Sequence, residues 1–215
     1  FYTDIKVGKE GVEPTFMSVD TLVNIIEKQY KEKLLSAMGL NTSFVRQYIP
    51  TITRMPDSKE LIEEQYDLLY GEFPTFNEDD YNQIALVVDE YNGISDITLA
   101  LLGYLRIELP EEVTKTDDVK FEDRKDFTIE EIVGKEVYLA SNSVMYKKYG
   151  DNFYFNAPQK SDCEKLKIVG VIRQKENVNG VLSTGFAYTS ALTRKVLKDN
   201  ADSEIAAAAR ENGTV

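Results

Sequence analysis

The sequence predicts an α+β fold: a mixed or antiparallel β-sheet, several short capped helices and one longer N-terminal amphipathic helix. Two observations lead to this fold class. Short capped helices are interleaved with apolar runs of strand length, and the last third of the chain is mostly β-like. The 215 residues are 42% hydrophobic and 29% charged, an ordinary globular composition with enough apolar material for a sizeable core.

The first predicted element is an amphipathic helix from about Ser18 to Met38. Ser18 is a favourable N-cap, Met17 and Leu22 stand at the positions of a hydrophobic staple, and Gly39 follows the last turn. Apolar residues recur along it at three- and four-residue steps, which predicts one face packed on the body of the protein. A contact face for a partner is the alternative interpretation of this stripe.

The next stretch gives weaker signals. Residues 41–55 mix helical and strand periods, so we expect irregular structure with an edge strand. Asp57 and Glu60 have capping-box spacing, which predicts a helix that opens near Ser58 and stops by Gly71. A polar loop follows this helix.

The middle of the chain predicts one buried strand and two short helices. The continuous apolar run 84–88 is typical of a strand buried on both faces. Residues 108–126 are acidic and have no period, which predicts a surface loop. The two helices each have a hydroxyl N-cap and a terminating glycine: Ser95 to Gly103, and Thr128 to Gly134 with Glu131 completing a capping box.

The last third predicts strands. A hairpin is expected where residues 144–146 and 153–155 flank the turn that begins at Gly150. The alternating segment 166–172 predicts a largely buried strand, which Gly170 keeps thin for close packing. Three further elements follow: a strand at 185–188, a helix capped by Thr189, and an Ala-rich helix capped by Ser203 that has little to pack against.

Charge and composition exclude several classes of function. The 37 acidic and 25 basic residues give a net charge of −12, which disfavours nucleic-acid and anionic-membrane partners. The chain has no histidine, which excludes serine and cysteine triads and histidine-ligated metals. One cysteine, Cys163, allows no internal disulfide. No apolar run approaches the ~20 residues of a membrane span, and the start at Phe1 predicts a piece of a longer chain.

Searches for chemical motifs point to no active site, cofactor or metal. Gly134-Lys135 lacks the upstream glycine of a phosphate-binding loop. The turn around Gly93 cannot be an EF-hand, although a looser carboxylate site using Asp89, Asn92 and Asp96 stays open beside the simpler interpretation as a strand-to-helix turn. The acidic neighbours of Cys163 disfavour a thiolate nucleophile.

The predicted hairpin is unusually rich in aromatic residues. Most of these should serve sheet packing, since aromatic residues favour strands. A surface that contacts a partner or ligand is the alternative, and the candidate contact residues are Tyr146, Tyr149, Phe153, Tyr154 and Phe155.

Six segments stand in a distinctive order: 66–74, 84–88, 101–103, 133–137, 166–173 and 187–192. They supply a Tyr-Gly-Glu-Phe-Pro segment, an apolar strand, a helix ending in Leu-Leu-Gly, a Val-Gly-Lys turn, an Ile-Val-Gly-Val strand and a strand leading into a helix. This succession resembles the sabre region in the extracytoplasmic domain of MacB/FtsX-like ABC transporter permeases, especially the large permeases of Gram-positive bacteria.

The resemblance implies a domain division. Residues 61–200 correspond to the sabre-like α+β domain, and residues 201–215 to a C-terminal helix that leads toward a missing membrane-proximal part. Residues 1–60 are expected to be an N-terminal helical insertion or a partial membrane-proximal segment, and the acidic loop 108–126 also departs from the family.

The resemblance also implies a function without an active site. An ABC ATPase subunit or domain hydrolyses ATP, and the external domain, anchored at the extracellular face of the membrane by segments outside this chain, transmits motion or contacts a protein, peptide or lipid. Two alternatives stay open. One is a free-standing surface or secreted module that holds a peptide or glycan with the Tyr-rich hairpin. The other is a histidine-free hydrolase with paired carboxylates.

Overall fold

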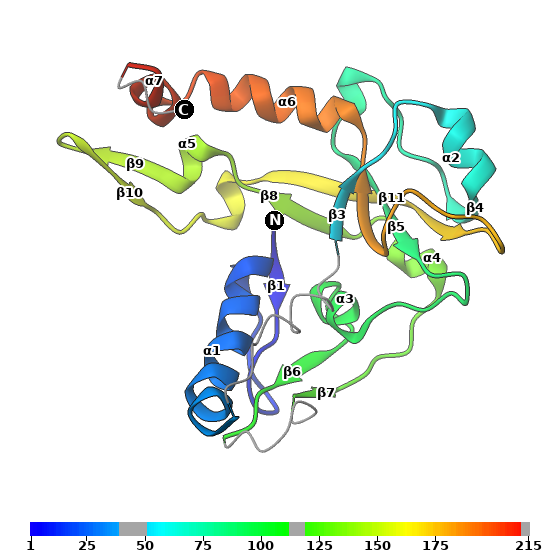
Figure 1. Ribbon diagram of the computed structural model, residues 1–215, viewed down its shortest axis with the longest axis horizontal. Helices are drawn as coiled ribbons and strands as arrows, with labels where there is room; N and C mark the ends of the chain where they lie inside the picture. The colour runs from blue at the N-terminus through cyan, green and yellow to red at the C-terminus, as the bar shows by residue number, and fades with distance from the viewer. Residues whose placement is uncertain (39–50, 112–118, 212–215) are drawn as a thin grey trace.

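A curled mixed β-sheet with short helices around it forms the body of the protein (Figure 1). This computed structural model describes residues 1–38, 51–111 and 119–211. The α+β class and the mixed sheet predicted from the sequence are confirmed. The Phe44–Ile49 part of the stretch expected to be irregular lies outside the described residues.

The main sheet has eight strands, and seven of them follow the order β2-β1-β8-β11-β5-β12-β3, while β4 pairs with β11. Their bounds are β1 Tyr2–Ile5, β2 Thr15–Ser18, β3 Thr51–Arg54, β4 Tyr66–Gly71, β5 Gln83–Val88, β8 Glu136–Leu139, β11 Glu164–Gln174 and β12 Gly185–Tyr188. Two small sheets stand apart from it: β6 Arg106–Glu108 with β7 Lys120–Glu122, and β9 Tyr146–Tyr149 with β10 Asn152–Phe155.

Seven α-helices accompany the sheets in the described part of the chain: α1 Val19–Met38, α2 Lys59–Gln65, α3 Asp96–Leu101, α4 Ile129–Ile132, α5 Asn142–Met145, α6 Ser190–Ala201 and α7 Glu204–Glu211. Several predicted caps are confirmed. The side chains of Ser18, Ser95 and Ser203 accept hydrogen bonds from backbone N–H groups three residues ahead, and Thr128 forms the predicted capping box. Thr189 is the N-cap of α6, but its hydroxyl makes no capping hydrogen bond.

The central strand is β11, which uses both of its edges. One edge pairs with β5 in parallel, and the other pairs antiparallel first with β8 and then with β4. Gly71 and Gly170 face each other where β4 approaches β11. A Cβ added to Gly170 would collide with the carbonyl oxygen of Glu72, so the close packing predicted for this glycine is confirmed.

The helix predicted to run from Ser58 to Gly71 is too long. Ser58 caps α2 by accepting the N–H of Leu61, but the helix ends at Gln65 and the chain continues as β4. Pairing with β11 supplies hydrogen-bond partners to the backbone of β4 and buries the ring of Tyr66. The Tyr66 hydroxyl donates to the carbonyl of Leu182 and accepts the N–H of the same residue. Tertiary pairing therefore overrides the local helix signal.

The surface loop predicted at 108–126 is partly wrong, because Lys120–Glu122 forms β7 and pairs with β6. The buried side chain of Arg106 lies between these segments. Its guanidinium donates to Asp123 (2.7 Å), to Glu108 (2.6 Å) and to the carbonyl of Gly8 (2.6 Å), so a buried charge is fully paired. The segment is thus ordered by the paired arginine together with Leu109, Val119 and Phe121, which pack against the main core without a regular apolar period.

Two other expectations need correction, and a third, the edge strand within residues 41–55, is confirmed. The first strand of the predicted hairpin begins at Tyr146, because Val144 and Met145 belong to α5. The expected edge strand is β3, which follows Pro50. The Ala-rich helix α7 does have packing partners, since it contacts α5, α6 and β9 and its four alanines are half-buried.

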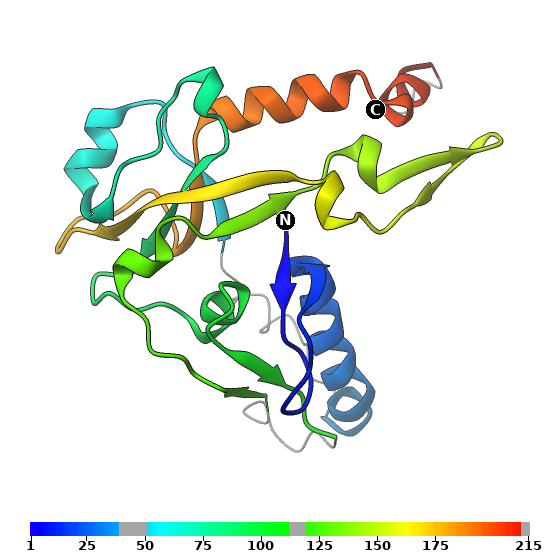
Figure 2. The same cartoon turned by 180° about the vertical axis from the view of Figure 1, so that it is seen from behind.

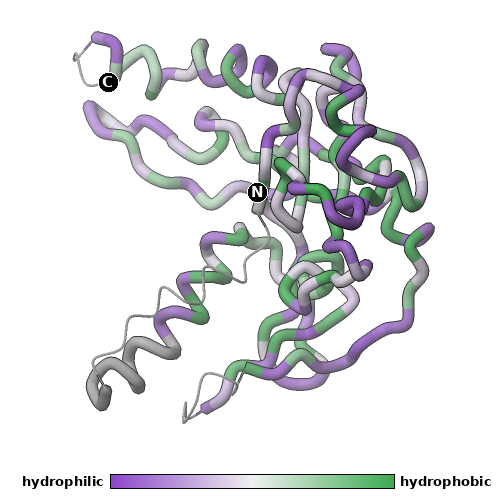
Figure 3. The backbone as a smooth tube through the Cα atoms, turned by 45° about the vertical axis from the view of Figure 1, so that its right-hand side comes forward, coloured by the Kyte–Doolittle hydropathy of each residue, from purple (hydrophilic) through white to green (hydrophobic). Residues whose placement is uncertain are grey.

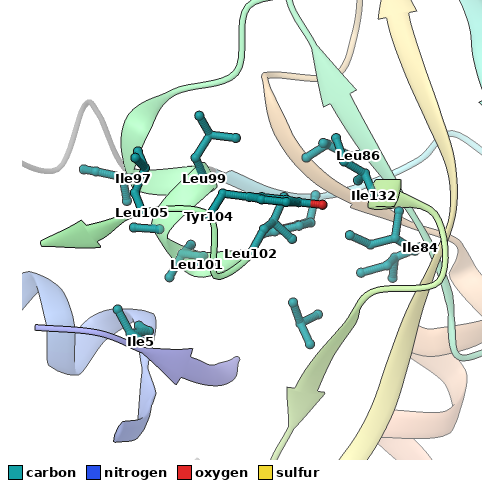
Figure 4. Packing of buried hydrophobic residues seen from close by; sticks show 14 of the residues in the cluster. Ile5, Ile84, Leu86, Ile97, Leu99, Leu101, Leu102, Tyr104, Leu105 and Ile132 are labelled. Atoms are coloured by element: carbon teal, nitrogen blue, oxygen red, sulfur yellow. The ribbon is translucent and has the colours of Figure 1, made fainter. Parts of the chain in front are cut away.

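The main hydrophobic core lies between the sheet and the segments around α3 and α4. Tyr104 is central to it: Figure 4 shows its ring reaching from the leucines around α3 toward Ile84, Leu86 and Ile132. Strands β1, β2 and β3 join the same sheet as the later strands, so residues 1–60 contribute to one architecture with residues 61–200. The domain boundaries at 60 and 200 stay a prediction.

The glycine contact gives a stability prediction. Gly170→Ala should lower the free energy of unfolding by about 3 kcal/mol or more, because the added methyl group forces β4 and β11 apart. Gly11→Ala is the control: it has a positive φ but no atom within 4 Å of the added methyl group, so it should cost only about 1 kcal/mol. Urea unfolding measures both, and equal losses would contradict the role assigned to Gly170.

Candidate functional site

The Tyr-rich hairpin formed by β9 and β10 extends away from the main sheet. Figures 1 and 2 show it running beside α6 and α7 at one end of the molecule. It follows α5, and the turn between its strands lies at Gly150 and Asp151, as predicted. In Figure 3 hydrophobic and hydrophilic residues alternate along it. It is therefore a ribbon with two accessible sides rather than part of a core.

The register of the hairpin divides its aromatic residues between its two faces. Tyr146 pairs with Phe155 and Lys148 pairs with Phe153, so these four residues share one face. Tyr149 and Tyr154 lie on the opposite face, where their ring centroids are 6.1 Å apart in a T-shaped arrangement. Tyr146 and Phe155 make a similar contact at 6.2 Å. Each face is thus held together by an edge-to-face ring pair.

Most of this aromatic surface is open to solvent. The exposed fractions are 37% for Tyr146, 67% for Tyr149, 53% for Tyr154 and 62% for Phe155, and Phe153 is half-buried. Single exposed aromatic residues are ordinary on protein surfaces. A cluster with rings on both faces of one ribbon differs, because packing the hairpin onto its own body could cover only one face.

The base of the hairpin is fixed by α5 and α7. The N–H of Asn156 donates to the carbonyl of Met145 (2.7 Å), which closes the hairpin at its base. Asn200, near the end of α6, accepts the N–H of Asn142 through its side-chain oxygen (2.8 Å). α7 packs against β9. The ribbon is therefore presented at a defined angle although its tip has few contacts.

Two lysines accompany the rings, and the sequence prediction did not single them out. Lys147 and Lys148 lie on opposite faces of β9, next to Tyr154 and Phe153 respectively. Lys147 donates to the carbonyl of Ser143 (2.9 Å). The alternation Tyr-Lys-Lys-Tyr is the signal that could have identified a two-sided aromatic and basic ribbon.

The structure does not bring together the looser carboxylate site proposed around Asp89. Asp89 accepts the N–H groups of Tyr91 and Gly93, whereas Asn92 faces Arg173 and Asp96 pairs with Arg124 (2.6 Å). Among the described residues, no group of three acidic or cysteine side chains is placed to hold a metal ion.

Two other features bear on catalysis. Burial, and then the neighbouring Asp162, raises the pKa of the Cys163 thiol, which agrees with the prediction that this cysteine does not form a thiolate readily. A hollow lined by Asp162, Glu164 and Asp199 measures only about 80 Å³, well below the roughly 300 Å³ of small-molecule pockets. Glu164 accepts the hydroxyl of Tyr81 at 2.6 Å, which raises the pKa of Tyr81 to about 12.

Comparisons with protein-family models, curated proteins and solved structures found no match to this chain. Across the residues that the structure describes, no helix has both the length and the apolar character needed to cross a membrane.

A stability measurement can separate a contact surface from a structural one. The double substitution Tyr149→Ser and Tyr154→Ser should change the free energy of unfolding by less than about 1 kcal/mol, because exposed side chains bury little area. Tyr66→Ala, at a site only 1% exposed, should cost about 3–5 kcal/mol. If urea unfolding shows the double variant to be destabilised by more than about 2 kcal/mol, the rings serve the fold rather than a partner.

Proposed function

We propose that this chain is a non-enzymatic external domain of a MacB/FtsX-like ABC transporter permease. One observation carries the proposal: segments of the resemblance that are far apart in the sequence assemble around one strand. β4, β5 and β8 come from three of these segments and all pair with β11, and β12 pairs with β5. The order that resembles the family thus corresponds to one sheet, as expected if those segments determine a common fold.

The proposed mechanism is mechanical. An ABC ATPase subunit or domain would hydrolyse ATP, and the external domain would pass the resulting motion to a partner or substrate. β11 has 11 residues and so spans about 35 Å, with neighbouring strands on both edges. A strand hydrogen-bonded on both sides moves as a unit with its sheet. This geometry suits a lever that connects the end near the hairpin with the end near β4.

Within this proposal the hairpin is the contact surface. Its exposed rings offer large apolar area at low cost in side-chain entropy, which is why tyrosine is common in binding surfaces. The extracellular partner would be a protein, or a peptide or lipid substrate. The exposed rings also favour the second candidate function, a free-standing surface or secreted module that binds a peptide or glycan through the same hairpin.

Cysteine labelling of the intact parent protein can test this. In a Cys163→Ser background, Asp151→Cys places a thiol at the exposed hairpin turn, and Ala100→Cys places a matched thiol in the core. We expect a membrane-impermeant maleimide to label the Asp151→Cys protein in intact cells, because this thiol is exposed to solvent on the external side of the membrane. The Ala100→Cys protein should stay unlabelled, because its thiol is buried in the core.

The identity of the protein that co-purifies with the labelled parent then distinguishes the permease domain from the free-standing module. An ABC-type ATPase recovered from detergent-solubilised membranes supports the permease. Labelled protein that is released from cells without detergent and without an ATPase supports the free-standing module. Labelling of the Asp151→Cys protein only after cell lysis would overturn both proposals.

A further inference from the structure

A second feature of the molecule is a hollow of about 370 Å³ beside the end of α3. Four separated parts of the chain line it: Thr3 and Asp4 of β1, the turn 101–103, the segment that leads from α4 into β8, and Lys160. Its volume falls within the roughly 300–1,000 Å³ typical of small-molecule pockets. The Gly134-Lys135 turn, which lacks the upstream glycine of a phosphate-binding loop, is part of this lining.

Four charged side chains line this hollow, and three of them have partners within the protein. Lys160 pairs with Asp4 at 2.5 Å, and its ammonium lies 4.8 Å from the centroid of the Tyr138 ring. Glu136 accepts the hydroxyl of Tyr138 at 2.7 Å and pairs with Lys165 at 3.3 Å. The charges of these three groups are therefore largely compensated.

Lys135 is the exception. Its ammonium lies 4.3 Å from the centroid of the Tyr104 ring, and it has no hydrogen-bond or ion-pair partner among the described residues. A cation–π contact compensates only part of the hydration that a half-buried ammonium loses. Burial, and then the neighbouring Lys125, lowers the pKa of Lys135, whereas Glu131 opposes this. Lys135, a residue of the lining, is thus a cation without an ion-pair partner in the described part of the chain, and the only opposing charge that acts on it there is the carboxylate of Glu131.

The backbone holds Lys135 in place. Its carbonyl oxygen accepts the N–H of Ile168 on β11 (2.9 Å), and its own N–H donates to Ile132 at the end of α4 (3.1 Å). A ligand that binds a charge on a fixed backbone loses less conformational entropy than one that must first order a loop, because the backbone is already ordered before binding.

We propose that this hollow binds a small monocarboxylate, whose anionic group pairs with Lys135. A single ammonium without an ion-pair partner matches a single negative charge. Asp4 and Glu136 stand at the same hollow and oppose a dianion such as a phosphate monoester. The proposal concerns this hollow alone and does not depend on the function of the hairpin.

The test is a titration of the protein with 3-phenylpropionate, followed by the ¹³Cε resonance of Lys135. We expect saturable binding with a Kd of about millimolar, as suits so small a ligand. The uncharged analogue 3-phenylpropanamide should bind at least about tenfold more weakly, because it lacks the charge that pairs with the ammonium. Binding of the acid should also raise the pKa of Lys135, since a nearby anion favours the charged form.

Substitution of Lys135 gives a second test of the same binding. Lys135→Met keeps the aliphatic stem and should weaken binding of 3-phenylpropionate at least about tenfold. Lys198→Met on α6 removes the same charge at an exposed residue that does not line the hollow and should leave the Kd unchanged. Equal affinity for the acid and the amide in the unsubstituted protein, or unaltered binding in Lys135→Met, would overturn the proposal.

The carboxylate could come from a free organic acid or from the C-terminus of a peptide. Titration with N-acetylalanylphenylalanine distinguishes these sources, because a peptide site would bind it more tightly than 3-phenylpropionate. Either ranking is consistent with the proposal provided that Lys135→Met weakens both ligands.

Discussion

The close approach of β4 and β11 at Gly71 and Gly170 is the constraint on which the rest of the structure depends. One edge of β11 pairs with β5, so β8 and β4 must both pair with the opposite edge of β11. The change from one partner to the other occurs within two residues: Ile168 bonds through its backbone to the turn before β8, and the carbonyl of Val169 accepts the N–H of Glu72. Any side chain at Gly170 would fill the space that this exchange needs.

The same change of strand partner positions both the hairpin and the hollow. The turn that bonds to Ile168 contains Lys135, so the cation in the hollow is placed by the central strand itself. β8 begins directly after that turn and continues through Tyr138 into α5 and the hairpin. The hollow therefore lies along β8, which contributes Glu136 and Tyr138 to its lining, and the hairpin follows the C-terminal end of the same strand, whose position is set by pairing with β11.

Features that depend on neighbouring residues could be predicted from the sequence, and features that depend on distant residues could not. The caps at Ser95 and Thr128 and the buried strand β5 were predictable because hydroxyl spacing and apolar runs act locally. β4 was mistaken for helix because its pairing with β11 is separated by about a hundred residues of sequence. β7 was missed because a buried arginine and two isolated apolar residues, Val119 and Phe121, order it without a recognisable period.

The two surfaces also differ in how far sequence could reveal them. The hairpin is one local stretch of ten residues, so its aromatic content was visible at once, although not its division into two faces. The hollow is assembled from four segments, each of which is locally ordinary. The net charge of −12 points away from an anionic ligand, yet charges beyond about 8 Å are largely screened at physiological ionic strength. At the hollow itself the unpaired charge is positive, so the local arrangement rather than the total charge decides what can bind there.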